Sequence, residues 1–182
     1  LGDSYLRNNQ KSAALSAYRK ASSMNFDKSI SEDSFLNYSK LSYEIGNPFE
    51  KVSNVLYAFL KKYPKNKNYE TIYKLLIDSY TKQKDYDSAL IILKDNKSFS
   101  NKDLIQQISF LKAVELFKLR QYDKAKEYFE QSIKTGNDQL YKLKSKYWLG
   151  RSFFALKKFD DALDQYKYYI KKKSNKDSKE YK

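Results

Sequence analysis

The sequence predicts an all-α protein made of about five helix–turn–helix hairpins, and three observations indicate this fold class. Glycine and proline are scarce, with four and two residues in a chain of 182, which suits helices joined by short turns. Large apolar residues recur at helical spacing around a repeated small or β-branched residue. That residue returns at intervals of 36 to 38 positions, at Ala14, Val52, Ala89, Ala125 and Ala162.

The first hairpin begins part-way through its first helix. Leu1 to Asn8 supplies half a helix, and the turn at Asn8–Gln10 leads into a second helix over Ser12–Ser22. Because the sequence opens inside a first helix, we expect the natural N-terminus of the protein to be missing.

The second hairpin follows a polar connector over residues 24–33. Ser31 is the expected start of its first helix, which Gly46 ends. Asn47 is then predicted to cap the second helix, with Pro48 in its first position. The register of the first helix is open by one residue, because Lys40 falls where a small residue is expected. The apolar stripe of the second helix is predicted at Phe49, Val52, Leu56, Phe59 and Leu60.

The remaining hairpins follow the same pattern. Their helices are expected over residues 69–82, 86–94, 101–119 and 122–134, and in a last hairpin around 147–170. The helix from Tyr86 should be short, because Asp95–Ser98 has weak helix propensity. The predicted units cover residues 1–24, 31–63, 66–97, 101–135 and 138–173, and residues 174–182 form a Lys-rich tail.

Composition excludes several kinds of chemistry. The chain has no cysteine and no histidine, so disulfides, thiolate catalysis, the usual zinc sites and His-based triads are ruled out. No phosphate-binding glycine loop or nucleophile elbow is present. Asp87, Asp123 and Asp160 recur at the start of second helices, and we interpret them as caps and dipole partners rather than as a carboxylate array. We therefore predict no catalytic residue, no cofactor, no metal and no enzyme activity.

The formal charge of +14 raises the question of nucleic acid. Only four of the 36 basic residues are arginines, although surfaces that read phosphate or base edges favour the arginine fork. We interpret the charge as solvation and as the codon bias of an AT-rich genome. An RNA-binding helical-repeat protein is the alternative function.

The pattern of the last hairpin resembles the tetratricopeptide repeat. Leu149–Gly150, Phe153, Phe159, Ala162 and Tyr166 match its Leu–Gly pair, aromatic, turn aromatic, Ala and aromatic. The resemblance implies a right-handed α-solenoid whose first helices line a concave groove. It also implies a non-enzymatic scaffold that binds protein or peptide segments.

The family's groove positions can be carried over to this sequence residue by residue. Two alternatives stay open for the aromatic members: they are core residues, or they pack on the helices of another protein. An apolar strip beside Lys118 and Arg151 would suit a segment with apolar anchors and a carboxylate. The implied groove residues are Lys74, Asp78 and Lys82, then Phe110, Val114, Phe117 and Lys118, and finally Tyr147, Arg151 and Phe154.

Two short phrases bear on location. Phe59–Pro64 and Tyr147–Gly150 resemble phrases of bacterial, Bacteroidetes-type cell-envelope members of the family, such as Tol-Pal coordinating and outer-membrane assembly or secretion lipoproteins. This resemblance implies a periplasmic protein in an envelope complex, with a cytoplasmic location as the alternative. No apolar run is long enough to span a bilayer. The sequence does not specify the oligomeric state.

Overall fold

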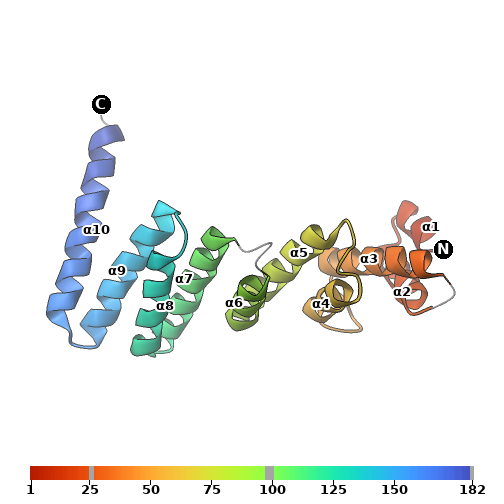
Figure 1. Ribbon diagram of the computed structural model, residues 1–182, viewed down its shortest axis with the longest axis horizontal. Coiled ribbons are helices and arrows are strands. Elements are labelled where there is room, and N and C mark those ends of the chain that lie inside the picture. The colour runs from red at the N-terminus through yellow and green to blue at the C-terminus, as the bar shows by residue number, and fades with distance from the viewer. Residues whose placement is uncertain (25–26, 97–100, 181–182) are drawn as a thin grey trace. The chain divides into compact units, whose positions relative to one another are not determined.

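The structure, a computed structural model, describes the backbone of residues 1–24, 27–96 and 101–180 and the side chains through Lys172. Within these ranges it contains ten helices and no strand, which confirms the all-α fold class (Figure 1). The chain divides into two compact units, residues 1–83 and 84–182, which are described separately. The helices are α1 (Gly2–Arg7), α2 (Lys11–Ser22), α3 (Lys28–Ile45), α4 (Val52–Lys62), α5 (Tyr69–Lys82), α6 (Tyr86–Asp95), α7 (Lys102–Lys118), α8 (Tyr122–Lys134), α9 (Gln139–Ala155) and α10 (Phe159–Glu180).

Four of the connections between paired helices share one turn geometry. Each has three residues, and the middle one adopts a left-handed conformation with φ between 57° and 60°. In the first, fourth and fifth pairs, the amide of the third turn residue donates to the carbonyl five residues earlier, at 2.8, 2.9 and 2.9 Å. The left-handed residues are Asn9, Lys84, Arg120 and Lys157.

The start of α3 differs from the prediction. Asp27 caps this helix, because its side chain accepts hydrogen bonds from the amides of Ser29 and Ile30 at 2.7 and 3.1 Å. Ser31 is instead buried in the first turn, where its hydroxyl donates to the carbonyl of Met24. The prediction that Ser31 starts the helix is wrong, because the carboxylate of Asp27 already satisfies two amides of the first turn.

The connection from α3 to α4 is longer than predicted. Gly46, at φ 81°, ends α3, but α4 begins only at Val52. The side chain of Asn47 accepts from the amides of Phe49 and Glu50 at 2.9 and 3.3 Å, so it closes a turn and does not cap α4. The predictions of a cap at Asn47 and of helical Pro48 are therefore wrong. Phe49 also lies outside the apolar stripe and is 46% exposed.

This longer connection changes the repeat register. The fourth residue of α2, α6, α8 and α10 is an alanine and is buried in each helix. In α4 the fourth residue is Val55, which is buried, whereas Val52 is partly exposed. The interval from Val55 to Ala89 is 34 residues. The predicted repeat position in the second hairpin was therefore wrong by three residues.

In the first unit, α1 to α5 pack in succession, and α3 also contacts α5. The crossing of α1 and α2 is close, because a Cβ added at Gly2 would lie 2.5 Å from the ring of Tyr18. The Tyr18 hydroxyl donates to Asp3 at 2.5 Å. Burial, reinforced by that carboxylate, raises the pKa of Tyr18. One core cluster of this unit consists of Ala14, Leu15, Tyr18, Tyr38, Leu41 and Val55.

In the second unit, α6 to α10 also pack in succession, and α7 contacts α9. The crossing of α9 and α10 repeats that of α1 and α2, because a Cβ at Gly150 would lie 2.7 Å from the ring of Tyr166. The backbone of α10 continues to Glu180, beyond Lys173, where the Lys-rich tail was expected to begin. One core cluster consists of Phe110, Ala113, Ala125, Phe129 and Leu149.

Candidate protein-binding surfaces

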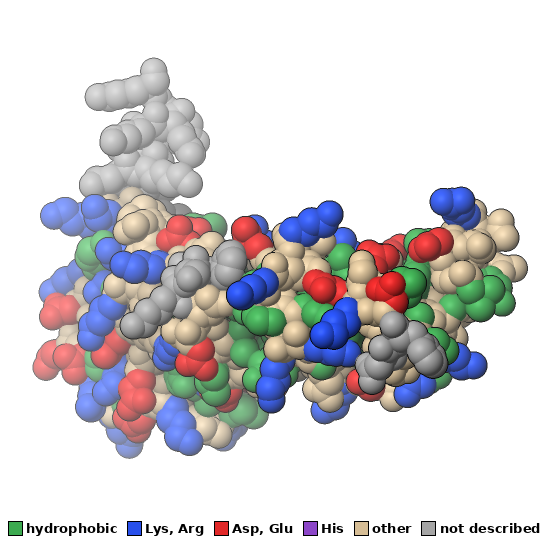
Figure 2. Space-filling view, turned by 45° about the vertical axis from the view of Figure 1, so that its right-hand side comes forward, with side chains coloured by type: hydrophobic (Ala, Val, Ile, Leu, Met, Phe, Trp, Pro, Cys, Tyr) green, Lys and Arg blue, Asp and Glu red, His purple; other side chains and the backbone are tan. Residues whose placement is uncertain are grey.

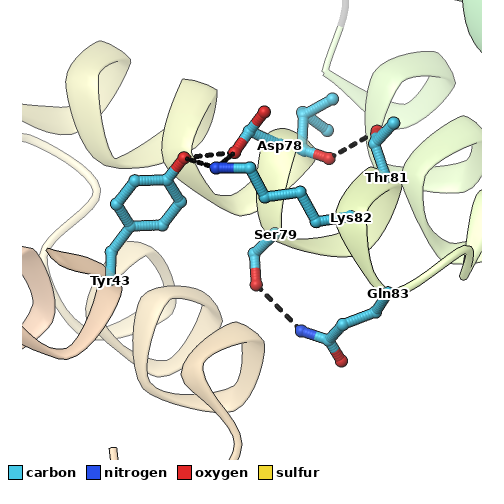
Figure 3. Close-up of polar contacts among 7 residues, drawn as sticks. Tyr43, Asp78, Ser79, Thr81, Lys82 and Gln83 are labelled. Carbon is cyan, nitrogen blue, oxygen red and sulfur yellow. Dashed lines mark hydrogen bonds and ion pairs between the residues drawn. The ribbon is translucent and has the colours of Figure 1, made fainter. Parts of the chain in front are cut away.

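The predicted groove residues of the first unit lie on α5 and already have partners. Lys74 forms an ion pair with Glu70 at 2.6 Å, and Lys82 forms one with Asp78 at 2.8 Å. Tyr43 on α3 points at the second pair: its hydroxyl donates to Asp78 and accepts from Lys82 at 2.7 Å (Figure 3). The two opposite charges therefore neutralise each other at the contact between α3 and α5.

Asp78 and Lys82 each have a pKa shifted in favour of the charged form. Burial acts to raise the pKa of Asp78, but hydrogen bonds from Lys82 and Tyr43 outweigh it and hold this pKa below its usual value. The hydrogen bond to Asp78 is the main cause that raises the pKa of Lys82. Both groups therefore stay charged across the neutral pH range.

The predicted groove residues of α7 divide into core and surface. Phe110 is only 9% exposed and packs on the rings of Phe129 and Tyr141, at centroid distances of 6.0 and 5.5 Å. Val114 and Phe117 are partly buried, and Lys118 is exposed. The interpretation of the aromatic residues as core therefore applies to Phe110, whereas α7 presents Lys118 to the solvent.

Arg151 on α9 lies beside Phe117. Its guanidinium carbon is 4.5 Å from the centroid of the Trp148 ring and 5.1 Å from that of Phe117. Trp148 itself packs between α7 and α8, 5.2 Å from Phe117 and 6.3 Å from Phe129. Within the described part of the chain, Arg151 forms no ion pair. Two aromatic rings thus orient an exposed cation.

The other two predicted residues of α9 face α10. Tyr147 is 38% exposed and lies 5.2 Å from the ring of Tyr169. Phe154 is 59% exposed and lies 5.4 Å from the ring of Phe159. The structure therefore brings Arg151 together with Phe117 and places Tyr147 and Phe154 beside the second helix of their own hairpin.

The family resemblance agrees with a comparison at the level of sequence. Models of the tetratricopeptide repeat match residues 1–28 and residues 110–177. The chain carries tetratricopeptide repeats. The second match begins inside α7 and includes all of α8 and α9, so the predicted fourth and fifth hairpins are repeats of this type.

Solved structures of MamA proteins resemble these tetratricopeptide repeats. One crystal structure of MamA covers 97% of this chain and 90% of its own, with 15% identity and a TM-score of 0.51. A mutant of MamA covers 95% and 88%, with 18% identity and a TM-score of 0.50. MamA from Desulfovibrio magneticus RS-1 covers 97% and 93%, with 15% identity and a TM-score of 0.47. The first two indicate a shared helical-repeat fold. No curated protein sequence matches the chain.

One buried amide between the last two tetratricopeptide repeats was not predicted. Gln106 on α7 is fully buried, and its side chain donates to the carbonyl of Asp138 and accepts from the amide of Asp138, both at 3.0 Å. The side chain of Asp103 accepts from the amide of Asn137 at 2.7 Å. These contacts fix the linker before α9. The sequence signal was weak, because two glutamines stand between Ile105 and Ile108 and only Gln106 is buried.

The recurring carboxylates of the second helices have structural positions. Asp87, Asp123 and Asp160 lie in the first turns of α6, α8 and α10, which confirms their predicted place at the start of second helices. The predictions that Asp87 caps α6 and Asp123 caps α8 are wrong. Asp85 accepts the capping hydrogen bond of α6 from the amide of Ser88 at 3.2 Å, and the N-cap of α8 is Gln121. Asp87 pairs instead with Lys112.

Charges of both signs are mixed on the face that Figure 2 shows, where lysine and arginine side chains are scattered among aspartate and glutamate side chains. Several lysines of the second unit also lie over aromatic rings, such as Lys112 over Tyr128 at 4.7 Å and Lys146 over Tyr168 at 5.1 Å. No helix among the described residues is long and apolar enough to cross a membrane.

Proposed function

We propose that this chain is a non-enzymatic scaffold that binds protein segments through the first helices of its tetratricopeptide repeats. The observation that supports the proposal is Arg151, an exposed cation without an ion pair among the described residues, oriented over Phe117 and Trp148. We include Val114 and Lys118, the neighbouring predicted groove residues of α7, and call the whole set the Arg151 surface.

The Arg151 surface favours a particular ligand chemistry. A guanidinium can donate two parallel hydrogen bonds to a carboxylate, and its position on aromatic rings limits the conformational entropy lost on binding. The partly buried Phe117 and Val114 supply apolar area beside it. We infer a protein segment with one carboxylate and one apolar anchor, bound in the groove that the repeats are expected to form.

We expect the polar residues of α5 to contribute less to the binding of protein segments. Lys74 and Lys82 are exposed and Asp78 is partly exposed on the first helix of the third repeat, but each is held in an ion pair. A ligand that binds there must exchange one ion pair for another, which yields little net affinity. We therefore expect the Arg151 surface to dominate the affinity for protein segments.

Selection from a displayed random-peptide library tests this function. We expect the selected peptides to combine a carboxylate with an apolar residue, and Arg151→Gln to weaken their binding by roughly tenfold or more. Arg120→Gln, an exposed arginine in a turn of the same unit, is the matched control and should leave affinity unchanged. Equal binding of the selected peptides to both variants would refute the role of Arg151.

The RNA alternative is separated from protein binding by its salt dependence. Phosphate contacts release counterions, so RNA affinity should fall by orders of magnitude between about 50 and 200 mM salt. Fluorescence anisotropy of a generic single-stranded RNA at these two salt concentrations measures this fall. Tight binding with a steep salt slope would favour the RNA function over the scaffold.

We also propose a location in a bacterial, Bacteroidetes-type cell envelope, within an assembly or secretion complex in the periplasm. The support is the likeness of Phe59–Pro64 and Tyr147–Gly150 to phrases of envelope proteins with this repeat. Fractionation of source cells, with an antibody against this chain, tests the location. Recovery in the cytoplasmic fraction alone would refute it.

A further inference from the structure

The fourth and fifth hairpins carry similar faces, apolar in both at five of six equivalent positions, with Lys126 where the fifth hairpin has Leu163. Helix α9 covers this face on the fourth hairpin only. Residues of α9 and α10 lie 37 positions after their equivalents on α7 and α8. In the fourth hairpin, α9 packs on both helices. We call the equivalent residues of the fifth hairpin its outward face, and they are Tyr147, Phe154, Phe159, Leu163, Tyr166 and Ile170.

Exposure separates the two faces. Phe110 is 9% exposed, whereas its equivalent Tyr147 is 38% exposed. Phe117 is partly buried, whereas Phe154 is 59% exposed. The second helices show the same difference, and Ile170 is 63% exposed. No described residue covers the outward face as α9 covers the fourth hairpin, so a stripe of aromatic and aliphatic side chains faces solvent.

The way α9 packs on the fourth hairpin indicates what kind of helix would fit the outward face of the fifth. In α9 the residues that cover α7 and α8 are aromatic or small apart from Leu149, which completes the core cluster. Trp148 stacks on Phe129, and Tyr141 packs on Phe110. The hydroxyl of Ser145 lies 2.9 Å from that of Ser132 on α8, where the two helices approach closely. A helix with this pattern of residues matches the outward face.

On the second and fourth hairpins, a polar side chain of the first helix binds the linker that leads to the next hairpin. Seven residues before the buried Ala113 stands Gln106, which binds Asp138 in the linker before α9. Seven residues before the buried Ser39 stands Glu32, which accepts from Asn66 in the linker before α5 at 2.6 Å. A polar side chain on the first helix therefore holds the next segment at both junctions.

The fifth hairpin has leucines at these positions. Leu143 stands seven residues before Gly150, and Leu140 takes the place of Asp103. They line a hollow of about 320 Å³ together with Gln139, Lys142, Tyr168 and Lys172. A leucine offers no hydrogen bond to a linker backbone, so this hollow fits an apolar side chain better than a polar turn.

We propose that the outward face binds an amphipathic helix of a partner protein, parallel to α9, with aromatic, leucine and small residues along its buried side. An apolar side chain at the N-terminal end of that helix fills the hollow between Leu140 and Leu143. Lys142 and Lys172 also line this hollow. They complement acidic residues in the first turn of the partner helix.

Two peptides and the 182-residue chain test the proposal. Both peptides copy residues 137–155, carry a fluorescein label and replace Asp138, by leucine in one and by alanine in the other. Both lose the same helix cap, so only the apolar side chain distinguishes them. We expect the leucine peptide to bind about tenfold tighter in an anisotropy titration, because burying a leucine side chain contributes that much affinity. The double variant Leu140→Asp/Leu143→Gln should abolish this preference.

Variants of the outward face decide the binding site. Phe154→Glu and Ile170→Glu should each reduce binding of the leucine peptide by at least about tenfold. Ile91→Glu, at an exposed apolar residue of α6 in the same unit, is the matched control. Circular dichroism melting verifies that all variants fold. Equal affinity of the two peptides, or binding unaffected by Phe154→Glu and Ile170→Glu, would overturn the proposal. Sedimentation showing a dimer that Ile170→Glu dissociates would assign the face to a second copy instead.

Discussion

Two junctions between successive hairpins occupy equivalent positions but use different chemistry. In the first unit, Tyr43 on α3 meets the ion pair of Asp78 and Lys82 on α5. In the second unit, Phe117 on α7 meets Trp148 and Arg151 on α9. Tyr43 lies four residues after the buried Ser39, and Phe117 lies four residues after the buried Ala113.

The difference shows that one repeat geometry accommodates a neutralised ion pair at one junction and an exposed cation over aromatic rings at the other. At the first junction the charges neutralise each other, so the contact is complete without a ligand. At the second, packing comes from aromatic rings, and the cation above them has no ion pair with a described residue. The aromatic junction should therefore dominate stability, and its arginine should be available for binding.

The largest effect is expected for Trp148→Ala. It removes a side chain that packs on both Phe117 and Phe129, and the free energy of unfolding should fall by about 2–4 kcal/mol, somewhat less than for a fully buried tryptophan. Urea titration measures this loss. The counterpart Tyr43→Phe removes only a hydroxyl at a part-exposed ion pair and should cost under about 1 kcal/mol. Similar losses for both variants would show that the two junctions do not differ in this way.

The buried amide should contribute the next largest effect. Gln106→Ala leaves the amide and carbonyl of Asp138 without their side-chain partner and should destabilise the chain by about 1–3 kcal/mol. Glu32→Ala, its equivalent in the first unit, removes one part-exposed contact to Asn66 and should cost about 0.5–1 kcal/mol. Urea midpoints of the two variants measure the difference. A larger loss for Glu32→Ala would reverse the ranking of the two linker contacts.

Two glycines test the linkers with a matched control. Gly136 adopts φ 72°, and an added Cβ would lie 2.5 Å from the side-chain oxygen of Gln106 and 2.9 Å from the carbonyl of Lys102. Gly46 adopts φ 81° but has no atom within 4 Å of an added Cβ. Gly136→Ala should therefore cost about 2 kcal/mol, and Gly46→Ala about 1 kcal/mol from backbone strain alone. Equal losses of melting temperature for the two variants would show that the linker before α9 is not tightly packed around Gly136.

Periodicity in the sequence predicted the hairpins but not everything that joins them. The recurring alanines mark helix crossings, because only a small side chain fits there, and four of the five predicted positions are buried alanines. The second hairpin was misregistered because Asn47 and Pro48 fit a turn as well as a helix start. The contact of Gln106 with Asp138 spans 32 residues and leaves no periodic signal.

The candidate site shows a second limit of sequence patterns. Phe110, Phe117, Tyr147 and Phe154 have the same spacing on their helices, so the pattern alone cannot separate core from surface. Their exposure depends on whether a following helix covers them, and in the fourth hairpin α9 does so. The position of Arg151 over two rings likewise depends on the packing of α9 against α7.

The smallest effect concerns pH and the first junction. Asp78 has a pKa below its usual value in the folded chain, so its contribution to stability is present above the unfolded pKa and is lost as pH falls through the folded pKa. The difference in melting temperature between the wild type and Asp78→Asn should therefore shrink as pH falls from 7 to below 3.8, the ordinary value. Because the pair is largely exposed, this difference should not exceed about 2 °C even at pH 7.

The aromatic junction of Phe117, Trp148 and Arg151 contains no carboxylate, so the loss of stability caused by Trp148→Ala should stay constant over the same pH range. A Trp148→Ala effect that changed with pH would mean that a carboxylate also stabilises the second junction, and the contrast between the two would fail.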